Sequence, residues 1–109
     1  MKVFMKFLLP ICFTLFSSVA FAGITQSQKI GQVLYNAEID YSYFIGEAKW
    51  KEENGCSGAT YVRIKSNLPG KKEILSIALS AHMASKNVRF RGNCDSDPDY
   101  YDAFYIIVN

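Results

Sequence analysis

Apolar and polar residues alternate along several short stretches of this chain, the pattern of half-buried β-strands. The clearest example is residues 41–50, in which Phe44, Ala48 and Trp50 share one parity. Stretches with this alternation or a comparable apolar run are residues 29–39, 41–50, 59–65, 88–92 and 100–108. The charged residues 51–55, the Pro-Gly pair at 69–70 and the polar residues 92–98 separate them as turns or loops. We therefore expect five short strands, the first with a break or bulge near Asn36.

The period changes between the third and fourth expected strands. Within residues 71–85, Ile74, Ile77, Ala78 and Ala81 follow the spacing of one face of an amphipathic helix. The element order is then β-β-β-α-β-β, which matches the OB-fold, a small partly open barrel. The alternative is an α+β sheet with one helix packed on one face. In the last strand, we expect Phe104, Ile106 and Val108 to lie on one side and Ala103, Tyr105 and Ile107 on the other.

The first 22 residues have the organisation of a secretory signal peptide. Lys2 and Lys6 precede an apolar run over residues 7–16, and Ala20 and Ala22 form an A-x-A cleavage pattern. The run is shorter than the roughly 20 apolar residues that span a membrane, and no later segment is apolar enough to span. We expect cleavage after Ala22, a single mature domain over residues 23–109, and a periplasmic or secreted protein.

Export determines how the cysteines are interpreted. Cys12 leaves with the leader, so Cys56 and Cys94 remain and are expected to form a disulfide. The alternative, a thiol nucleophile at Cys56, has little support because His82, the single histidine, lies on the expected helix.

The charge of the mature chain excludes some classes of partner. The full chain has 12 Lys and Arg against 10 Asp and Glu, and the leader holds two of the lysines, so the mature domain is neutral. Nucleic acid is not an expected partner, because phosphate backbones are bound through excess positive charge. We also see no phosphate-binding glycine loop, Cys-x-x-Cys pair or nucleophile elbow, and we expect no cofactor, no metal site and no catalysis.

Three smaller features have ordinary structural interpretations. The alternate carboxylates of residues 95–99 resemble a calcium loop, but the sixth position is Tyr100 and the twelfth is Ile106, so an acidic turn is favoured. Trp50 shares parity with Phe44 and is expected in the core, with a pocket cap beside residues 51–58 as the alternative. For His82 we expect a partly buried, hydrogen-bonded ring.

The best surface candidate is the outward parity of the second and third strands. An OB-fold commonly binds oligosaccharides or oligonucleotides on this strand face and its flanking loops. Aromatic rings and charged groups share the parity: Tyr41, Tyr43, Glu47, Lys49, Tyr61, Arg63 and Lys65. An ordinary solvated sheet face or a subunit interface would have the same composition. Arg89, Arg91 and Tyr105 are candidates for an edge or interface.

The second half of the chain resembles a group of small exported gammaproteobacterial proteins. The resemblance rests on residues 74–81 (ILSIALSA), 85–90 (SKNVRF), a following cysteine and 104–108 (FYIIV), with Cys-Ser-Gly at 56–58 upstream. These proteins in turn resemble the B subunits of subtilase-type and pertussis-like AB5 toxins, which are OB-folded, disulfide-bonded, pentameric glycan binders. The resemblance implies a non-catalytic binding module for a glycan or protein partner, and a homo-oligomer. The alternative function is an envelope accessory or inhibitory protein that binds another protein through its sheet edges. A small hydrolase is a third reading, without a visible activated nucleophile or acid/base pair.

Overall fold

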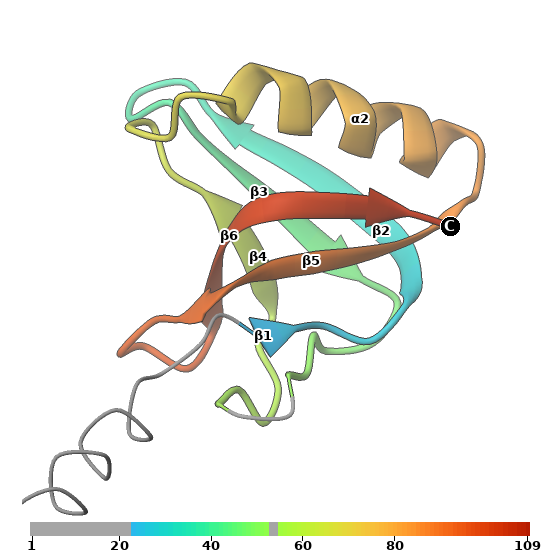
Figure 1. The fold of residues 1–109 in the computed structure, drawn as a ribbon. Helices are drawn as coiled ribbons and strands as arrows, with labels where there is room; N and C mark the ends of the chain where they lie inside the picture. The colour runs from blue at the N-terminus through green and yellow to red at the C-terminus, as the bar shows by residue number, and fades with distance from the viewer. Residues whose placement is uncertain (1–22, 53–54) are drawn as a thin grey trace, which may run out of the picture.

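The computed structural model describes residues 23–52 and 55–109, so the expected leader lies outside the described residues. The fold is mainly β, with six strands in one sheet and a single helix in the described residues (Figure 1). The elements are β1 Gly23–Ile24, β2 Gln28–Asn36, β3 Tyr41–Gly46, β4 Tyr61–Ile64, α2 Lys71–Met83, β5 Asn87–Cys94 and β6 Tyr100–Val108. No helix in this part of the chain has the length and apolar character needed to cross a membrane.

The strands form a partly closed ring. β2, β3 and β4 are successive antiparallel neighbours, β4 pairs in parallel with β6, and β6 pairs antiparallel with β5. The ring is completed where Gln28 and Lys29 of β2 pair with the start of β5. This arrangement confirms the expected β-β-β-α-β-β barrel, to which the two-residue β1 is added along β5. The expected alternative, a sheet with a helix on one face, is not what forms.

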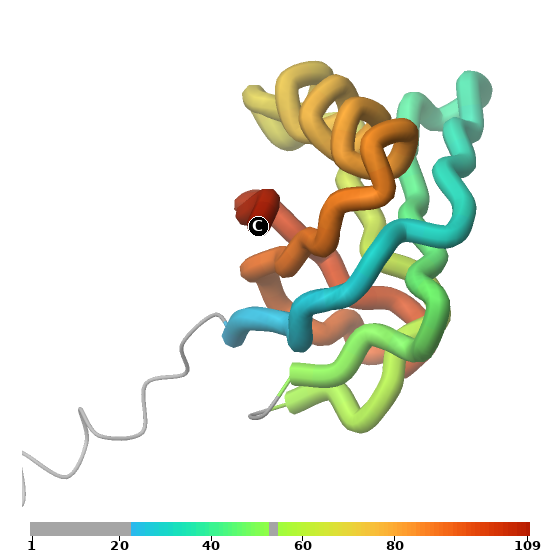
Figure 2. The backbone as a smooth tube through the Cα atoms, turned by 90° about the vertical axis from the view of Figure 1, so that its right-hand side faces the viewer, coloured from blue at the N-terminus to red at the C-terminus, as the bar shows by residue number. Residues whose placement is uncertain are grey.

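Helix α2 lies across one end of the ring (Figure 2). Its buried residues are Ile74, Ala78 and Ala81, and Leu75 is partly buried against the core beside them. Ile77 was expected on the same face but is 43% exposed, because the helix covers only the narrow barrel end rather than a broad sheet. His82 fulfils its expectation: it is partly buried and its Nδ1 lies 2.8 Å from the carbonyl oxygen of Ile30.

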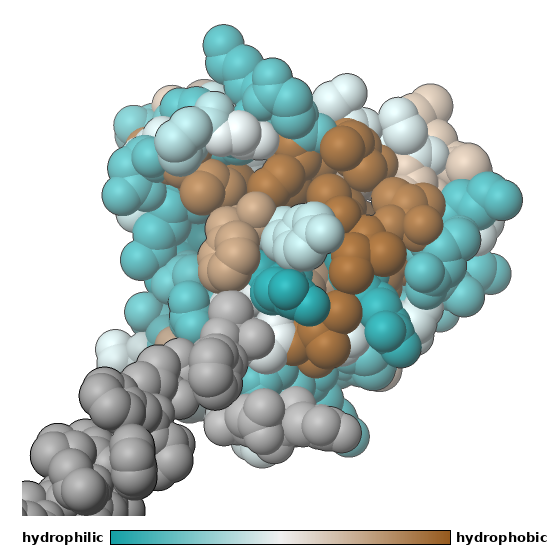
Figure 3. All heavy atoms as spheres, viewed as in Figure 1, coloured by the Kyte–Doolittle hydropathy of each residue, from teal (hydrophilic) through white to brown (hydrophobic). Residues whose placement is uncertain are grey.

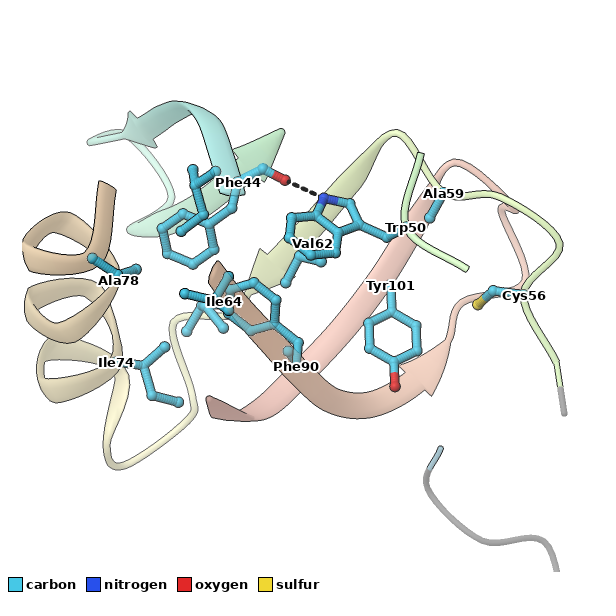
Figure 4. Close-up of a cluster of buried hydrophobic side chains, with 14 residues drawn as sticks. Phe44, Trp50, Cys56, Ala59, Val62, Ile64, Ile74, Ala78, Phe90 and Tyr101 are labelled. Carbon is cyan, nitrogen blue, oxygen red and sulfur yellow. Dashed lines mark hydrogen bonds between the residues drawn. The ribbon is translucent and has the colours of Figure 1, made fainter. Parts of the chain in front are cut away.

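The core is built around four large side chains that are fully buried (Figure 4). Phe44 and Phe90 stack with ring centroids 5.4 Å apart, and Trp50 meets Phe90 edge-on at 5.2 Å. The Trp50 indole N–H donates to the carbonyl of Phe44 at 3.1 Å, so the buried polar atom is satisfied. Tyr101 donates its hydroxyl to the carbonyls of Gly23 and Gly92. Trp50 is therefore a core residue, as expected, and does not cap a pocket.

Two bulges change the side-chain parity expected from the sequence. In β6, Arg91 pairs with Tyr105 while Gly92 pairs with Ala103, so Phe104 is an extra residue and is exposed. The prediction of one unbroken alternation over residues 100–108 is therefore wrong. The irregularity of β2 falls between Ile30 and Gln32 rather than near Asn36.

The disulfide between Cys56 and Cys94 is present, with Cα atoms 5.7 Å apart. It joins the segment before β4 to the end of β5 and confirms the pairing expected from the sequence. Cys56 is itself buried. The bridge therefore fixes the end of the barrel opposite the helix (Figure 4).

Candidate functional site

Outward side chains of β3, β4 and β6 meet on one face of the barrel. Tyr43 pairs across the ladder with Arg63, and Arg63 pairs with Asp102. One step away, Tyr61 pairs with Tyr100. Their neighbours in sequence, such as Val62 and Tyr101, point inward and are fully buried, so the pleat directs this second set outward.

Four tyrosine rings from these three strands form a continuous cluster around Arg63. The rings of Tyr61 and Tyr100 are stacked, with centroids 5.3 Å apart and planes at 18°. Tyr43 meets Tyr61 edge-on at 5.7 Å and Tyr100 at 6.2 Å. Tyr41 extends the cluster, 6.3 Å from Tyr43. We call this surface the tyrosine face and define it as Tyr41, Tyr43, Tyr61, Tyr100 and Arg63.

Arg63 is fixed by carboxylates and by rings. Its Nε and Nη2 atoms donate to the two oxygens of Asp102 at 2.6 and 3.1 Å, and Nη2 lies 3.5 Å from Asp95. The guanidinium also lies over the Tyr100 ring at 4.5 Å and near the Tyr41 ring at 5.8 Å. The hydrogen bond to Asp102 raises the pKa of Arg63 above its ordinary value. This bidentate geometry makes Arg63 a rigid cation within the cluster.

Asp102 also receives a second cation. The Lys65 amino group lies 3.3 Å from the Asp102 Oδ2 atom, so one carboxylate holds both basic side chains of β4 and its extension. Burial raises the pKa of Tyr43, so its phenol keeps its proton in the neutral range. The face therefore presents phenol hydroxyls beside carboxylate oxygens.

The structure brings together five of the six residues for which we predicted ligand binding. Tyr41, Tyr43, Tyr61 and Arg63 are in direct contact, and Lys65 joins them through Asp102. Lys49 does not take part in these contacts. β3 ends at Gly46, where the Gln28 side chain takes over the backbone hydrogen bonds of Ala48, and the chain then leaves the ladder. Glu47 and Lys49 are exposed beyond that point.

Sequence reasoning missed three contributors, Tyr100, Asp102 and Asp95. Tyr100 and Asp102 flank the inward Tyr101, so their outward direction was available from the alternation of residues 100–103. What the sequence did not contain was the parallel pairing of β4 with β6, which joins residues 39 positions apart. Asp95 comes from the loop between β5 and β6.

Besides the tyrosine face, the described residues include a polar hollow and an acidic loop. An open hollow of about 700 Å³ lies between β1, the segment around Cys56 and Arg89, and its lining contains no aromatic ring. In the β5–β6 loop, Asp95 and Asp97 accept backbone N–H groups of residues two positions ahead, as in an ordinary acidic turn. No three His, Cys, Asp or Glu side chains within 23–52 and 55–109 gather as metal ligands would.

Comparisons with known proteins add no functional assignment to this geometry. No family model matches the chain, and neither curated proteins nor solved structures give a significant match. The features of the molecule that bear on function are therefore the tyrosine face and the fold that positions it.

Proposed function

We propose that the protein is a non-catalytic binding module of the periplasm or the extracellular space that binds a glycan on the tyrosine face. The observation that supports this most directly is the gathering of four tyrosine rings around one fixed arginine on the β3–β4 surface. In an OB-fold the corresponding second and third strands and their flanking loops are the usual oligosaccharide-binding surface.

The chemistry of the face suits a sugar. Sugar rings have an apolar side of C–H groups, which packs against aromatic rings, and a rim of hydroxyls that need hydrogen-bond partners. The rings of Tyr61, Tyr100 and Tyr43 provide the platform, while phenol hydroxyls and carboxylate oxygens of Asp95 and Asp102 provide the partners. Both of those carboxylates are held by Arg63, so they serve this proposal as fixed acceptors and not as an acid/base pair.

A glycan array with the mature protein tests the proposal, with Tyr43→Ala and Tyr61→Ala as variants. Each truncation removes one ring of the tyrosine face, and we expect at least about a tenfold loss of affinity, the scale of a contact worth 1.4 kcal/mol. Tyr35→Ala is the matched control, because Tyr35 is exposed and its hydroxyl donates to Asp40, which is not a member of the tyrosine face. Absence of any glycan binding, or equal losses from all three substitutions, would count against the proposal.

The exported location is part of the same proposal. A disulfide is expected in the periplasm or outside the cell, and the described residues contain one. Expression of the full chain in a bacterial host, followed by fractionation and intact mass measurement, tests it. We expect a product that begins at Gly23 and lacks both thiol protons; an unprocessed chain in the cytoplasmic fraction would contradict this.

A second candidate function, the accessory or inhibitory protein, is supported by the edge of β6. Beyond Asp102, β6 pairs with β5 and with no other strand of the described part of the chain. Phe104 and Val108 are exposed there, and hydrophobic atoms gather over β5 and β6 below α2 (Figure 3). An extended, apolar segment of a partner protein would add to this edge as a further strand.

The substitution Val108→Lys separates this candidate from glycan binding. It places a charge at the free edge, so it should abolish partner capture from envelope extracts and leave glycan affinity unchanged. Light scattering on the same pair of proteins tests whether a homo-oligomer, which the resemblance to toxin B subunits implies, is built through this edge. A monomer at high concentration would remove that arrangement.

A further inference from the structure

We infer that the glycan bound by the tyrosine face is uncharged, and that Asp102 is the residue that excludes acidic sugars. This inference rests on the proposed function and names its ligand class. It follows from how the basic side chains around the face are engaged, since an anionic sugar is recognised through a cation that is available to it.

The basic side chains whose contacts place them at the face are each matched by a carboxylate. Arg63 is bound by Asp102 and Asp95, and Lys65 is bound by Asp102. At the end of the face near Tyr41, the Lys71 amino group binds Asp40 and also donates to the carbonyl of Ser66.

Further negative charge lies beside the rings. Asp99 accepts a hydrogen bond from the Thr60 hydroxyl at 3.4 Å, next to the stacked Tyr61 and Tyr100. A carboxylate or sulfate on a sugar at this platform would approach the carboxylates of Asp95 and Asp99 before it reached an unengaged cation. Like charges repel, and among the described residues Asp99 forms no ion pair that would offset this repulsion.

The pair between Arg63 and Asp102 also resists exchange. The side chains are only 14% and 23% exposed, and the guanidinium is held by two parallel hydrogen bonds and by the Tyr100 ring. An acidic sugar would have to break this bidentate pair, leaving the partly buried Asp102 with Lys65 as its remaining cation. A neutral sugar needs no such exchange, because its hydroxyls can donate to the carboxylate lone pairs that Arg63 and Lys65 leave open.

Asp102 therefore sets the charge selectivity, since it engages two cations at once. The substitution Asp102→Asn keeps the shape and one hydrogen-bond acceptor but removes the negative charge. Arg63 and Lys65 then carry net positive charge beside the platform, and binding of acidic glycans should appear. Asp95→Asn should shift selectivity in the same direction by less, because Asp95 makes a single 3.5 Å contact.

The experiment compares binding of two oligosaccharides that differ only in a terminal carboxylate-bearing sugar. The proteins are the mature wild type, Asp102→Asn, Asp95→Asn and the control Asp97→Asn. Asp97 is exposed, and its recorded side-chain contact is the backbone N–H of Asp99, which an Asn can also satisfy. We expect the wild type and Asp97→Asn to prefer the neutral oligosaccharide by at least tenfold, and Asp102→Asn to shift that ratio at least tenfold toward the acidic one.

The possible outcomes are distinct. A wild type that prefers the acidic oligosaccharide would overturn this inference and leave glycan binding intact. A folded Asp102→Asn protein with an unchanged ratio would also overturn it. If Asp102→Asn does not fold, Asp95→Asn decides the question by the direction of its shift. A wild type that binds neither oligosaccharide nor any other glycan on the array refutes the proposed function and the inference together.

Discussion

Removal of the Cys56–Cys94 disulfide should cost a large part of this domain's stability. The bridge joins residues 38 positions apart. The loop-closure entropy that it removes from the unfolded chain corresponds to about 4 kcal/mol at 25 °C. A domain of this size has a free energy of unfolding of roughly 4–13 kcal/mol, so the loss would bring it close to marginal stability. The melting temperature should fall by about 15–30 °C.

The double substitution Cys56→Ala and Cys94→Ala is the appropriate perturbation. Cys56 is buried, so alanine avoids placing an additional hydroxyl in the core. Urea unfolding can be followed through Trp50, the single tryptophan and a fully buried one, with far-ultraviolet circular dichroism as a second probe. Wild-type protein reduced with dithiothreitol should unfold at nearly the same urea concentration as the double variant.

Two results would refute this reasoning. A loss below about 1 kcal/mol would show that the bridge does not restrict the unfolded chain as the loop length requires. Titration of two reactive thiols in unfolded, unreduced protein would show that the bridge does not form at all.

Three further predictions concern the buried Tyr101 and the β6 bulge. Tyr101→Phe removes a hydroxyl that donates to Gly23 and Gly92 at 2.8 and 3.1 Å, so urea unfolding should show a loss of about 1–2 kcal/mol; no loss would mean that these carbonyls are satisfied otherwise. Burial raises the pKa of Tyr101 to about 12 from an ordinary value of 10.0. Because the folded state holds this proton more tightly, the stabilisation is complete below pH 10 and disappears between about pH 10 and 12. The wild type should therefore lose stability relative to Tyr101→Phe across that window. Parallel curves of stability against pH for the two proteins would contradict the assignment. Gly92→Ala places a Cβ 2.0 Å from the Asp102 carbonyl oxygen, so we expect a loss of about 3 kcal/mol or more by thermal unfolding, and a near-neutral result would mean that the bulge relaxes freely.

The elements that the sequence predicted well depend on local patterns. Alternation alone directs Phe44, Val62 and Ile64 inward, and the 3.6-residue period alone places a helix near residues 71–85. The disulfide followed from the number of cysteines left after the expected export. The strands and the helix are determined by residues close together in sequence, and the disulfide by the two cysteines that remain after cleavage.

The parts that failed depend on contacts that no local pattern contains. Lys49 is exposed but takes no part in the ring cluster, because β3 ends at Gly46 and the Gln28 side chain replaces the strand hydrogen bonds at Ala48. Asp102 reaches Arg63 through a parallel pairing across 39 positions, and Phe104 is displaced by a bulge opposite Arg91 and Gly92. The residues of β3 and β4 could be predicted because these strands are neighbours in sequence. The residues of β6 could not, because β6 follows only after the helix and pairs with β4 across that separation.

The most direct test of the account is a solution NMR titration of the mature protein with the neutral oligosaccharide that it binds best on the array. We expect saturable shifts of the aromatic signals of the tyrosine face and of the Arg63 side-chain N–H, with Tyr35 and Tyr105 unaffected. Shifts confined to the β6 edge, or no saturable shift on the tyrosine face, would contradict it.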